Sequence, residues 1–152
     1  GGRVLRARDH IDDKPFMLTY GDGVADVDLN ALLKFHQSHG KTTTMTSIQP
    51  DSRFGVLKLG SNGQVDAFQE KPKGEDSWIN GGFFVCEPSV MDRITDGDDT
   101  IFERGPLESL ASDGNLVTYH HNGFWQCMDT LRDKIHLNEM WDRREAPWKL
   151  WD

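Results

Sequence analysis

Residues 16–24 read Phe-Met-Leu-Thr-Tyr-Gly-Asp-Gly-Val, an apolar run that ends in a carboxylate between two glycines. The run from Phe16 to Tyr20 is typical of a strand buried on both faces of a sheet. Asp22 would lie just past the carboxyl end of that strand, where open α/β sheets bind ligands. Gly21 and Gly23 let the backbone turn tightly and let a ligand approach. The stretch therefore predicts a functional carboxylate at Asp22.

An Asp-Gly pair is also common in the turn of a β-hairpin. Residues 24–39, however, read as a loop and then a helix, with no returning strand. The helix expected over 29–39 has Leu, Leu, Leu and His at i, i+3, i+4 and i+7. Asp26 or Asp28 would cap its start, and Gly40 its end. A β-rich stretch at 42–48 follows, so the order strand, helix, strand predicts a crossover unit of a parallel sheet.

The remaining chain predicts further strands and helices of an α/β fold. Residues 54–59 and 64–69 flank an Asn-Gly turn and form the clearest hairpin signal. A strand over 78–87 is interrupted by two glycines, which indicate either a β-bulge or the close approach of a ligand or another backbone. Other expected segments are a connection over 3–11, a short helix from Pro88 to 94, a helix in the second half of 101–112, a strand over 115–121, a loop over 122–129 and a helix from Thr130, where Asp133 would complete a capping box.

The bulk properties exclude several classes of protein. A length of 152 residues fits a single domain over 1–152. A net charge of -8, from 17 basic and 25 acidic residues, argues against a nucleic-acid partner but allows one phosphorylated small molecule to be bound. Two cysteines without C-x-x-C spacing give no zinc or redox motif. No run approaches the ~20 apolar residues of a membrane span. We expect a cytoplasmic protein with no membrane partner.

Three groups could carry chemistry. Asp22 and Asp129, far apart in the sequence, together suit Mg²⁺, which prefers hard oxygen ligands from one or two carboxylates. Asp129 could equally be a carboxylate stabilised by a helix N-terminus. Glu70-Lys71-Pro72 could hold sugar hydroxyls and a phosphate, although a solvated charged turn is the commoner meaning of such a tripeptide. Asn80-Gly81-Gly82 is the third group. The histidine pairs 36/39 and 120/121 lack a third ligand, so zinc is disfavoured.

The last helix carries apolar residues on two sides. One side holds Met128, Leu131 and Ile135, and the other holds Leu137, Met140 and Trp141. This pattern indicates a helix covered from two directions, one of them by a partner subunit, and predicts a homo-oligomer. The tail over 146–151 carries two tryptophans beyond a proline, so we expect it to pack on the body or on a neighbour.

Five motifs in register resemble the sugar-1-phosphate nucleotidylyltransferase family, and within it the enzymes that act on glucose 1-phosphate and CTP. They are Tyr-Gly-Asp-Gly-Val at 20–24, Arg-Phe-Gly at 53–55, Phe-Gln-Glu-Lys-Pro-Lys at 68–73, Trp-Ile-Asn-Gly-Gly-Phe-Phe-Val at 78–85 and Gly-Phe-Trp-Gln-Cys-Met-Asp-Thr-Leu-Arg-Asp at 123–133. The resemblance covers essentially the whole chain. It implies an incomplete Rossmann-like mixed sheet flanked by helices, with a β-hairpin insertion, and transfer of a nucleotidyl group that gives CDP-glucose and pyrophosphate.

The resemblance also implies roles for single residues. Asp22 and Asp129 would be the Mg²⁺ ligands and, with Lys71, the catalytic residues. Lys71 would hold the sugar phosphate. The substrate-binding set would be Tyr20, Gly21, Gly55, Glu70, Lys71, Asn80, Gly81 and Trp125, of which Glu70 would hold sugar hydroxyls.

The chain departs from the family pattern in two places. The glycine-rich G-x-G-T-R-L loop, which belongs to an N-terminal portion of the family domain, has no counterpart in residues 1–152. We therefore expect impaired catalysis by this chain alone. The alternative is a module that binds sugar phosphates or directs assembly without turnover. Cys127 stands where the family motif has proline, which would loosen the loop that aims Asp129.

Overall fold

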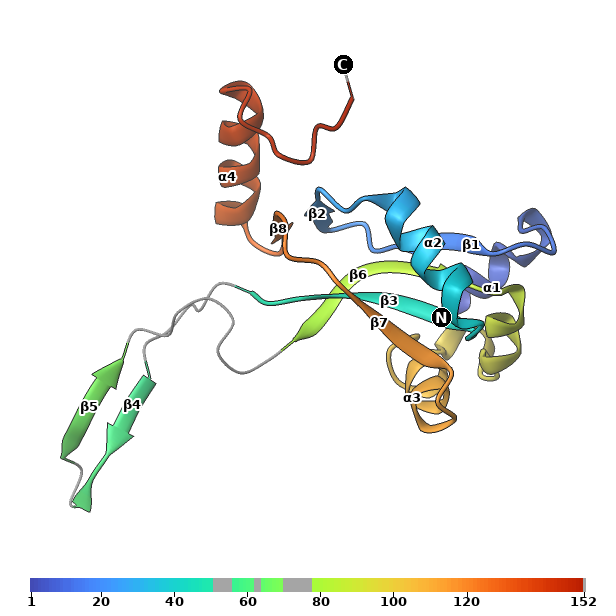
Figure 1. Cartoon of the computed structure of the whole chain (residues 1–152), viewed down its shortest axis with the longest axis horizontal. Helices are drawn as coiled ribbons and strands as arrows, with labels where there is room; N and C mark the ends of the chain where they lie inside the picture. Colours follow the sequence, from blue (N-terminus) through green and yellow to red (C-terminus); the bar gives the residue numbers. More distant parts are fainter. Residues whose placement is uncertain (51–55, 62–63, 70–77, 152) are drawn as a thin grey trace.

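The computed structural model describes residues 1–50, 56–61, 64–69 and 78–151 (Figure 1). The main sheet has four strands in the order β1, β6, β3, β7. Strand β6 runs antiparallel to both of its neighbours, whereas β3 and β7 are parallel. The predicted mixed α/β sheet is confirmed, with strands β1 (Phe16–Thr19), β6 (Ile79–Cys86), β3 (Thr43–Ile48) and β7 (Leu116–His120).

Two further antiparallel pairs stand beside this sheet. Strands β4 (Val56–Leu59) and β5 (Val65–Gln69) confirm the predicted hairpin, whose Asn-Gly turn lies outside the described residues. Strands β2 (Gly23–Ala25) and β8 (Trp125–Cys127) pair where loops were predicted. Three-residue strands are too short to show a period of two, and their partners lie far away in the sequence.

The prediction that the 16–20 strand is buried on both faces is wrong. Within the described part of the chain, β1 pairs only with β6, and Met17 is 44% exposed. The predicted crossover also needs correction. Strands β1 and β3 do point the same way, but β6 lies between them and is antiparallel to both. A short apolar run does not distinguish a central strand from an edge strand that packs on one face.

Local signals placed most of the helices correctly. The side chain of Asp28 accepts a hydrogen bond from the backbone N–H of Ala31, and Gly40 ends that helix with a left-handed φ of 64°. The capping box at Thr130 is also present. Residues 3–11, expected to be a connection, instead form two helical segments. The helices are α1 (Gly2–Arg6), η1 (Arg8–His10), α2 (Leu29–His39), η3 (Pro88–Arg93), η4 (Gly97–Asp99), α3 (Gly105–Ser112) and α4 (Leu131–Asp142).

Strand β6 carries a hydrophobic core on each face of the sheet. Phe84 and Cys86 pack with residues of η3 and α3, whereas Val85 packs with Leu32 of α2. Alternate side chains of a strand point to opposite faces, so one strand can serve both cores. Figure 1 shows α2 and α3 on opposite sides of the sheet. None of the described helices is long and apolar enough to cross a membrane.

A β-bulge interrupts β6 at its two glycines. The register with β3 passes from Met45 opposite Phe84 to Ser47 opposite Asn80, so β6 carries extra residues here. The backbone N–H of Phe83, displaced from the regular ladder, donates instead to Thr46 Oγ1 at 3.3 Å. Both alternatives raised for the glycines hold in part, because there is a bulge and the neighbouring strand approaches closely.

A chain of hydrogen bonds ties the end of α2 to β3 and β6. The backbone N–H of Lys41 donates to His39 Nδ1 at 3.0 Å, so the ring proton of neutral His39 lies on Nε2. His39 Nε2 then donates to Thr44 Oγ1 at 2.8 Å, and that hydroxyl lies 2.8 Å from Nδ1 of buried His36. The Nε2 atom of His36 donates to Glu87 Oε1 at 3.1 Å. In this arrangement the single ring proton of each neutral histidine makes one hydrogen bond.

This network makes the free energy of unfolding depend on pH through His39. Burial, followed by the charges of His36 and Lys41, lowers the pKa of His39 below its ordinary value of 6.5. The unfolded chain therefore takes up this proton at a higher pH than the folded chain. The stability contribution is present above pH 6.5 and is lost as the pH falls through the folded-state pKa. In urea unfolding measured between pH 7.5 and 5, His39→Gln should show a smaller loss of stability than the wild type. His10→Gln, in exposed η1, should keep the wild-type slope; equal slopes in all three would contradict the assignment.

The bulge predicts that Gly81 does not tolerate a side chain. A Cβ atom there would lie 2.7 Å from Thr46 Oγ1 and 3.2 Å from Ile48 Cγ2. We expect Gly81→Ala to lower the free energy of unfolding by about 1–3 kcal/mol, since the closely packed strand must shift. Gly105→Ala is the matched control, because no described atom lies within 4 Å of a Cβ built there. Chemical denaturation measures both, and similar stabilities for the two variants would overturn the packing argument.

Candidate active site

The site lies where β6 begins and where the segments after β1 and around β8 approach it. The backbone N–H of Tyr20 donates to the carbonyl of Gly82 at 3.0 Å, which joins the end of β1 to the bulge. The indole N–H of Trp125 donates to the carbonyl of Gly81 at 2.8 Å, which joins β8 to the same bulge. The carbonyls of Gly82 and Gly81 leave the regular ladder of β6. They are bound instead by the backbone of Tyr20, at the end of β1, and by the Trp125 side chain.

The pairing of β2 with β8 brings the backbone of Asp22 next to the segment that carries Asp129. Gly23 lies opposite Cys127, and the backbone N–H of Met128 donates to the carbonyl of Asp22 at 2.8 Å. Asp22 therefore lies one residue beyond the ladder on one strand, and Asp129 lies two residues beyond it on the other. Both side chains are exposed. Exposed carboxylates can attract a cation that keeps water in its shell.

The capping box of α4 fixes the residue that follows Asp129. Asp133 Oδ2 accepts from the backbone N–H of Thr130 at 3.0 Å and from its hydroxyl at 2.8 Å, and the Asp133 N–H donates back to Thr130 Oγ1. Cys127, which replaces the family proline, lies in β8 opposite Gly23. Asp129 therefore stands between a paired strand and a capped helix.

Asn80 has a defined orientation. Its Oδ1 accepts from the backbone N–H of Gly82 at 2.8 Å, and its Nδ2 lies 3.2 Å from the Tyr20 hydroxyl. Because the Gly82 N–H can only donate, these contacts fix which end of the amide is oxygen. Burial, followed by a hydrogen bond to Glu103, raises the pKa of Tyr20 well above 10.0, so its hydroxyl stays protonated.

Five residues of the predicted set lie on two segments that contact each other. They are Tyr20, Gly21 and Asp22 on the segment after β1, and Asn80 and Gly81 on β6. Trp125 joins them through its indole bond, and Asp129 through the β2–β8 pair. The other three predicted residues, Gly55, Glu70 and Lys71, lie outside the described residues, so their roles stay predictions.

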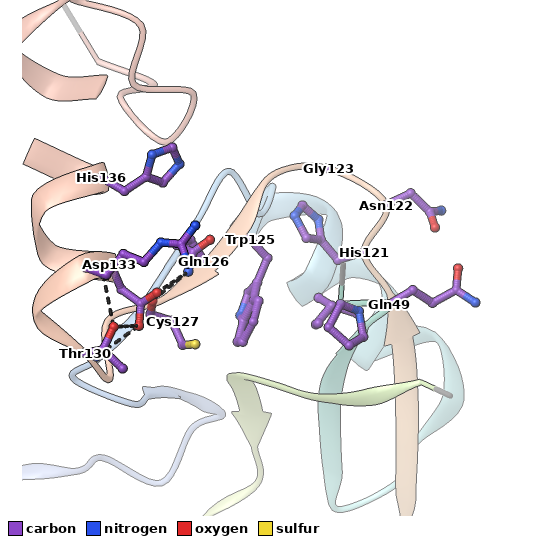
Figure 2. Close-up of a pocket in the computed structure, with 13 residues that line it drawn as sticks. Gln49, His121, Asn122, Gly123, Trp125, Gln126, Cys127, Thr130, Asp133 and His136 are labelled. Atoms are coloured by element: carbon purple, nitrogen blue, oxygen red, sulfur yellow. Dashed lines mark hydrogen bonds between the residues drawn. The ribbon is translucent and has the colours of Figure 1, made fainter. Parts of the chain in front are cut away.

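A hollow of about 800 Å³ adjoins this cluster on the α4 side of β8. Figure 2 shows Trp125 reaching from β8 toward β6 and His136 reaching from α4 over the same space. Trp125 is the predicted site residue that lines it; Asp22 and Asp129 do not. The described lining residues are Ile48, Gln49, Pro50, His121, Asn122, Gly123, Trp125, Gln126, Cys127, Thr130, Arg132, Asp133 and His136.

His121 lines this hollow, and the sequence analysis did not identify it as a site residue. His121 Nε2 lies 3.0 Å from both the carbonyl of Phe124 and Asp26 Oδ1. A Cβ at Gly123 would overlap the Asp26 carboxylate and the His121 ring, so the loop packs closely on this contact. The sequence disfavours zinc at the His120-His121 pair. The described residues hold no cluster of three His, Cys, Asp or Glu that could bind a metal ion. The pairing of His121 with Asp26 has no sequence signal.

Proteins of other organisms are similar to this chain in sequence. The chain is 52% identical over 153 residues to glucose-1-phosphate cytidylyltransferase of Salmonella typhimurium, an alignment that covers 100% of this chain and 59% of the relative. It is 43% identical over 150 residues to a probable glucose-1-phosphate cytidylyltransferase of Bacillus subtilis, with 99% and 58% covered. The chain thus spans less than two thirds of the length of these relatives.

Solved structures share the fold. HddC from Yersinia pseudotuberculosis superposes with a TM-score of 0.65 at 19% identity, over 92% of this chain and 61% of that one. A putative glucose-1-phosphate thymidylyltransferase from Bacillus anthracis gives 0.62 at 16% identity, over 98% and 60%. The sequence pattern described as nucleotidyl transferase matches residues 3–132. The chain therefore belongs to the nucleotidyl transferase family.

Proposed function

We propose that this chain provides the sugar-phosphate and metal-binding part of an enzyme that makes CDP-glucose from CTP and glucose 1-phosphate. The observation that carries the proposal is the pairing of β2 with β8, in which the carbonyl of Asp22 binds the N–H of Met128, the residue before Asp129. The high identity to glucose-1-phosphate cytidylyltransferases supports the choice of sugar and nucleotide. The reaction joins a phosphate oxygen of the sugar phosphate to the α-phosphorus of CTP, and the bond to the leaving pyrophosphate breaks.

Mg²⁺ is the proposed cofactor, and the donor set fits it. Asp22 and Asp129 supply hard carboxylate oxygens, and both are exposed, so water and phosphate oxygens can complete the shell. The described residues add no third His, Cys, Asp or Glu, which a dedicated zinc site would require. Bound there, the ion would neutralise charge on the phosphate groups.

The chain's own residues would orient the sugar. The amide of Asn80 is fixed by Gly82 and Tyr20, and its remaining hydrogen-bonding capacity can serve a sugar hydroxyl. Trp125 is fixed at its indole N–H by Gly81, so it can offer its ring as an apolar wall of the hollow. Lys71 would bind the sugar phosphate and Glu70 a hydroxyl, as the family resemblance implies. Positioning and charge neutralisation account for most catalysis of this type.

The first test is pyrophosphate release from CTP and glucose 1-phosphate in the presence of Mg²⁺. We expect Asp22→Asn and Asp129→Asn each to lower kcat/KM by about 100-fold, because a charge contact with the reacting phosphates is lost. Asp12→Asn, on an exposed loop before β1, should leave the rate unchanged. Turnover that survives both site substitutions would remove Asp22 and Asp129 from the mechanism.

A second candidate function is sugar-phosphate binding without turnover. It would need only the fixed amide of Asn80, which can hold a sugar hydroxyl whether or not a nucleotide is bound. Calorimetry with glucose 1-phosphate, together with the pyrophosphate assay, distinguishes the two candidate functions. Binding without pyrophosphate release supports the second function, binding with release supports the first, and no binding contradicts both.

We further propose that the chain forms a homo-oligomer through α4. Its outward stripe carries Leu131 at 71% exposed and Ile135 at 49% exposed, whereas Leu137 on the inner side is buried. Trp148 of the tail packs on Phe124 with ring centroids 5.3 Å apart, but Leu150 and Trp151 remain exposed. Apolar patches of this kind mark association surfaces.

Light scattering after size-exclusion chromatography tests the α4 surface. Leu131→Lys combined with Ile135→Lys should shift the wild-type oligomer to monomer, since two charges would be buried without partners. Lys134→Ala, on the same helix but without loss of apolar area, should keep the wild-type mass. A wild-type chain that stays monomeric at high concentration would overturn the proposal.

A further inference from the structure

Trp78 is an exposed aromatic side chain that is held in place just before β6. It is 41% exposed, although its ring packs on that of His120 with centroids 4.1 Å apart. His120 is fixed in turn, because its Nδ1 lies 3.0 Å from the hydroxyl oxygen of buried Ser47. A tryptophan side chain has only two torsions, so a contact on one part of the ring restrains all of it. The exposed part of the ring is therefore a preformed apolar surface.

The strand register places this ring beside Asn80. Asn80 of β6 lies opposite Ser47 of β3, and Ser47 lies opposite His120 of β7. Directly paired residues project from the same face of a sheet, so these three side chains form a row across the strands. Trp78 comes two residues before Asn80 and extends across β3 to contact His120, so it lies on the same face. One face of the sheet thus carries an apolar ring next to the amide that would bind a sugar hydroxyl.

The shape of glucose 1-phosphate suits an aromatic ring on one side only. Its ring hydroxyls are equatorial, so axial C–H groups cover the two faces of the sugar ring. In the α anomer the phosphate is axial and projects from one of these faces. The electron-rich face of an aromatic ring repels an anion, so an indole would pack on the opposite face of the sugar. Contact there removes apolar C–H groups from water, which is favourable.

We propose that Trp78 stacks on the sugar face opposite the phosphate and thereby selects sugars with an equatorial hydroxyl at carbon 4. The proposal rests on the proposed function, since the sugar phosphate held at Asn80 is the ligand. Galactose 1-phosphate differs from glucose 1-phosphate only at carbon 4, where its hydroxyl is axial and projects from the face that Trp78 would cover. That hydroxyl would be pressed against the indole without a hydrogen-bond partner, which costs free energy. His120 is a positioning residue, because it acts by holding Trp78.

Nuclear magnetic resonance of the ¹⁵N-labelled chain detects the stack directly. The indole N–H signal of Trp78 is identified by its absence in Trp78→Phe. We expect this signal to shift when glucose 1-phosphate is added and to stay in place with the same concentration of inorganic phosphate. A shift with CTP but none with glucose 1-phosphate would show that the ring stacks on a nucleobase, and would overturn the proposal. An unmoved signal in a chain that binds glucose 1-phosphate by calorimetry would overturn it as well.

Calorimetry with the two sugar phosphates tests the selection. We expect the wild type to prefer glucose 1-phosphate to galactose 1-phosphate. Trp78→Ala should weaken glucose 1-phosphate binding by roughly three- to tenfold and galactose 1-phosphate binding much less, so the preference falls. Trp78→Phe keeps an aromatic face and should retain most of the preference, whereas His120→Ala should reduce it. Leu29→Ala is the matched control. It removes an apolar side chain that is 47% exposed at the start of α2, and should change neither affinity.

The variants also separate a binding role from a structural one. If chemical denaturation shows that Trp78→Ala is unfolded, Trp78→Leu replaces it with the same expectation, since leucine keeps apolar bulk without an aromatic face. Wild-type affinity for glucose 1-phosphate in the folded variant would overturn the stack. Equal losses for the two sugars, or a wild type without preference, would overturn the selection at carbon 4. A wild-type chain that binds neither sugar phosphate overturns the proposed function, a result distinct from all of these.

Discussion

Between Phe84 and Asn80, β6 changes from a strand packed on both faces to a bulge whose peptide groups are bound from outside the sheet. The regular half holds the two cores, because Phe84 and Val85 point to opposite faces. The irregular half presents the carbonyls of Gly81 and Gly82 to Trp125 and Tyr20. A bulge redirects backbone groups that a regular ladder would consume. One strand therefore supports the fold and also fixes the position of the site.

The second constraint is the ladder between β2 and β8. Its three residue pairs join parts of the chain between which β3, β6 and β7 of the main sheet lie in the sequence. The cost of closing such a long loop grows only slowly with its length, so a few hydrogen bonds together with packing can maintain it. Main-chain pairing joins Asp22 to Met128, the residue before Asp129. Both carboxylates are exposed, so water screens their charges.

Local sequence signals predicted the structural features that depend on residues close together in the chain. Asp28, Gly40 and the Thr130 capping box marked helix ends correctly because a cap involves residues only a few positions apart. The status of β1 as an edge strand, and the existence of β2 and β8, depend on partners far away in the sequence. For the site, resemblance selected Asn80 and Trp125, which the fold brings together.

The two halves of the proposed site differ in how firmly they are held. Asp22 and Asp129 are exposed on a short ladder, which suits an ion that arrives with water and phosphate and adjusts its shell. Asn80 is bound on both ends of its amide, and Trp125 is fixed at its indole nitrogen. Discrimination between sugars needs donors and acceptors that cannot turn over, because a mobile amide satisfies either partner. Selectivity for the sugar should therefore reside in the network at the bulge, while the carboxylates contribute charge without choosing among sugars.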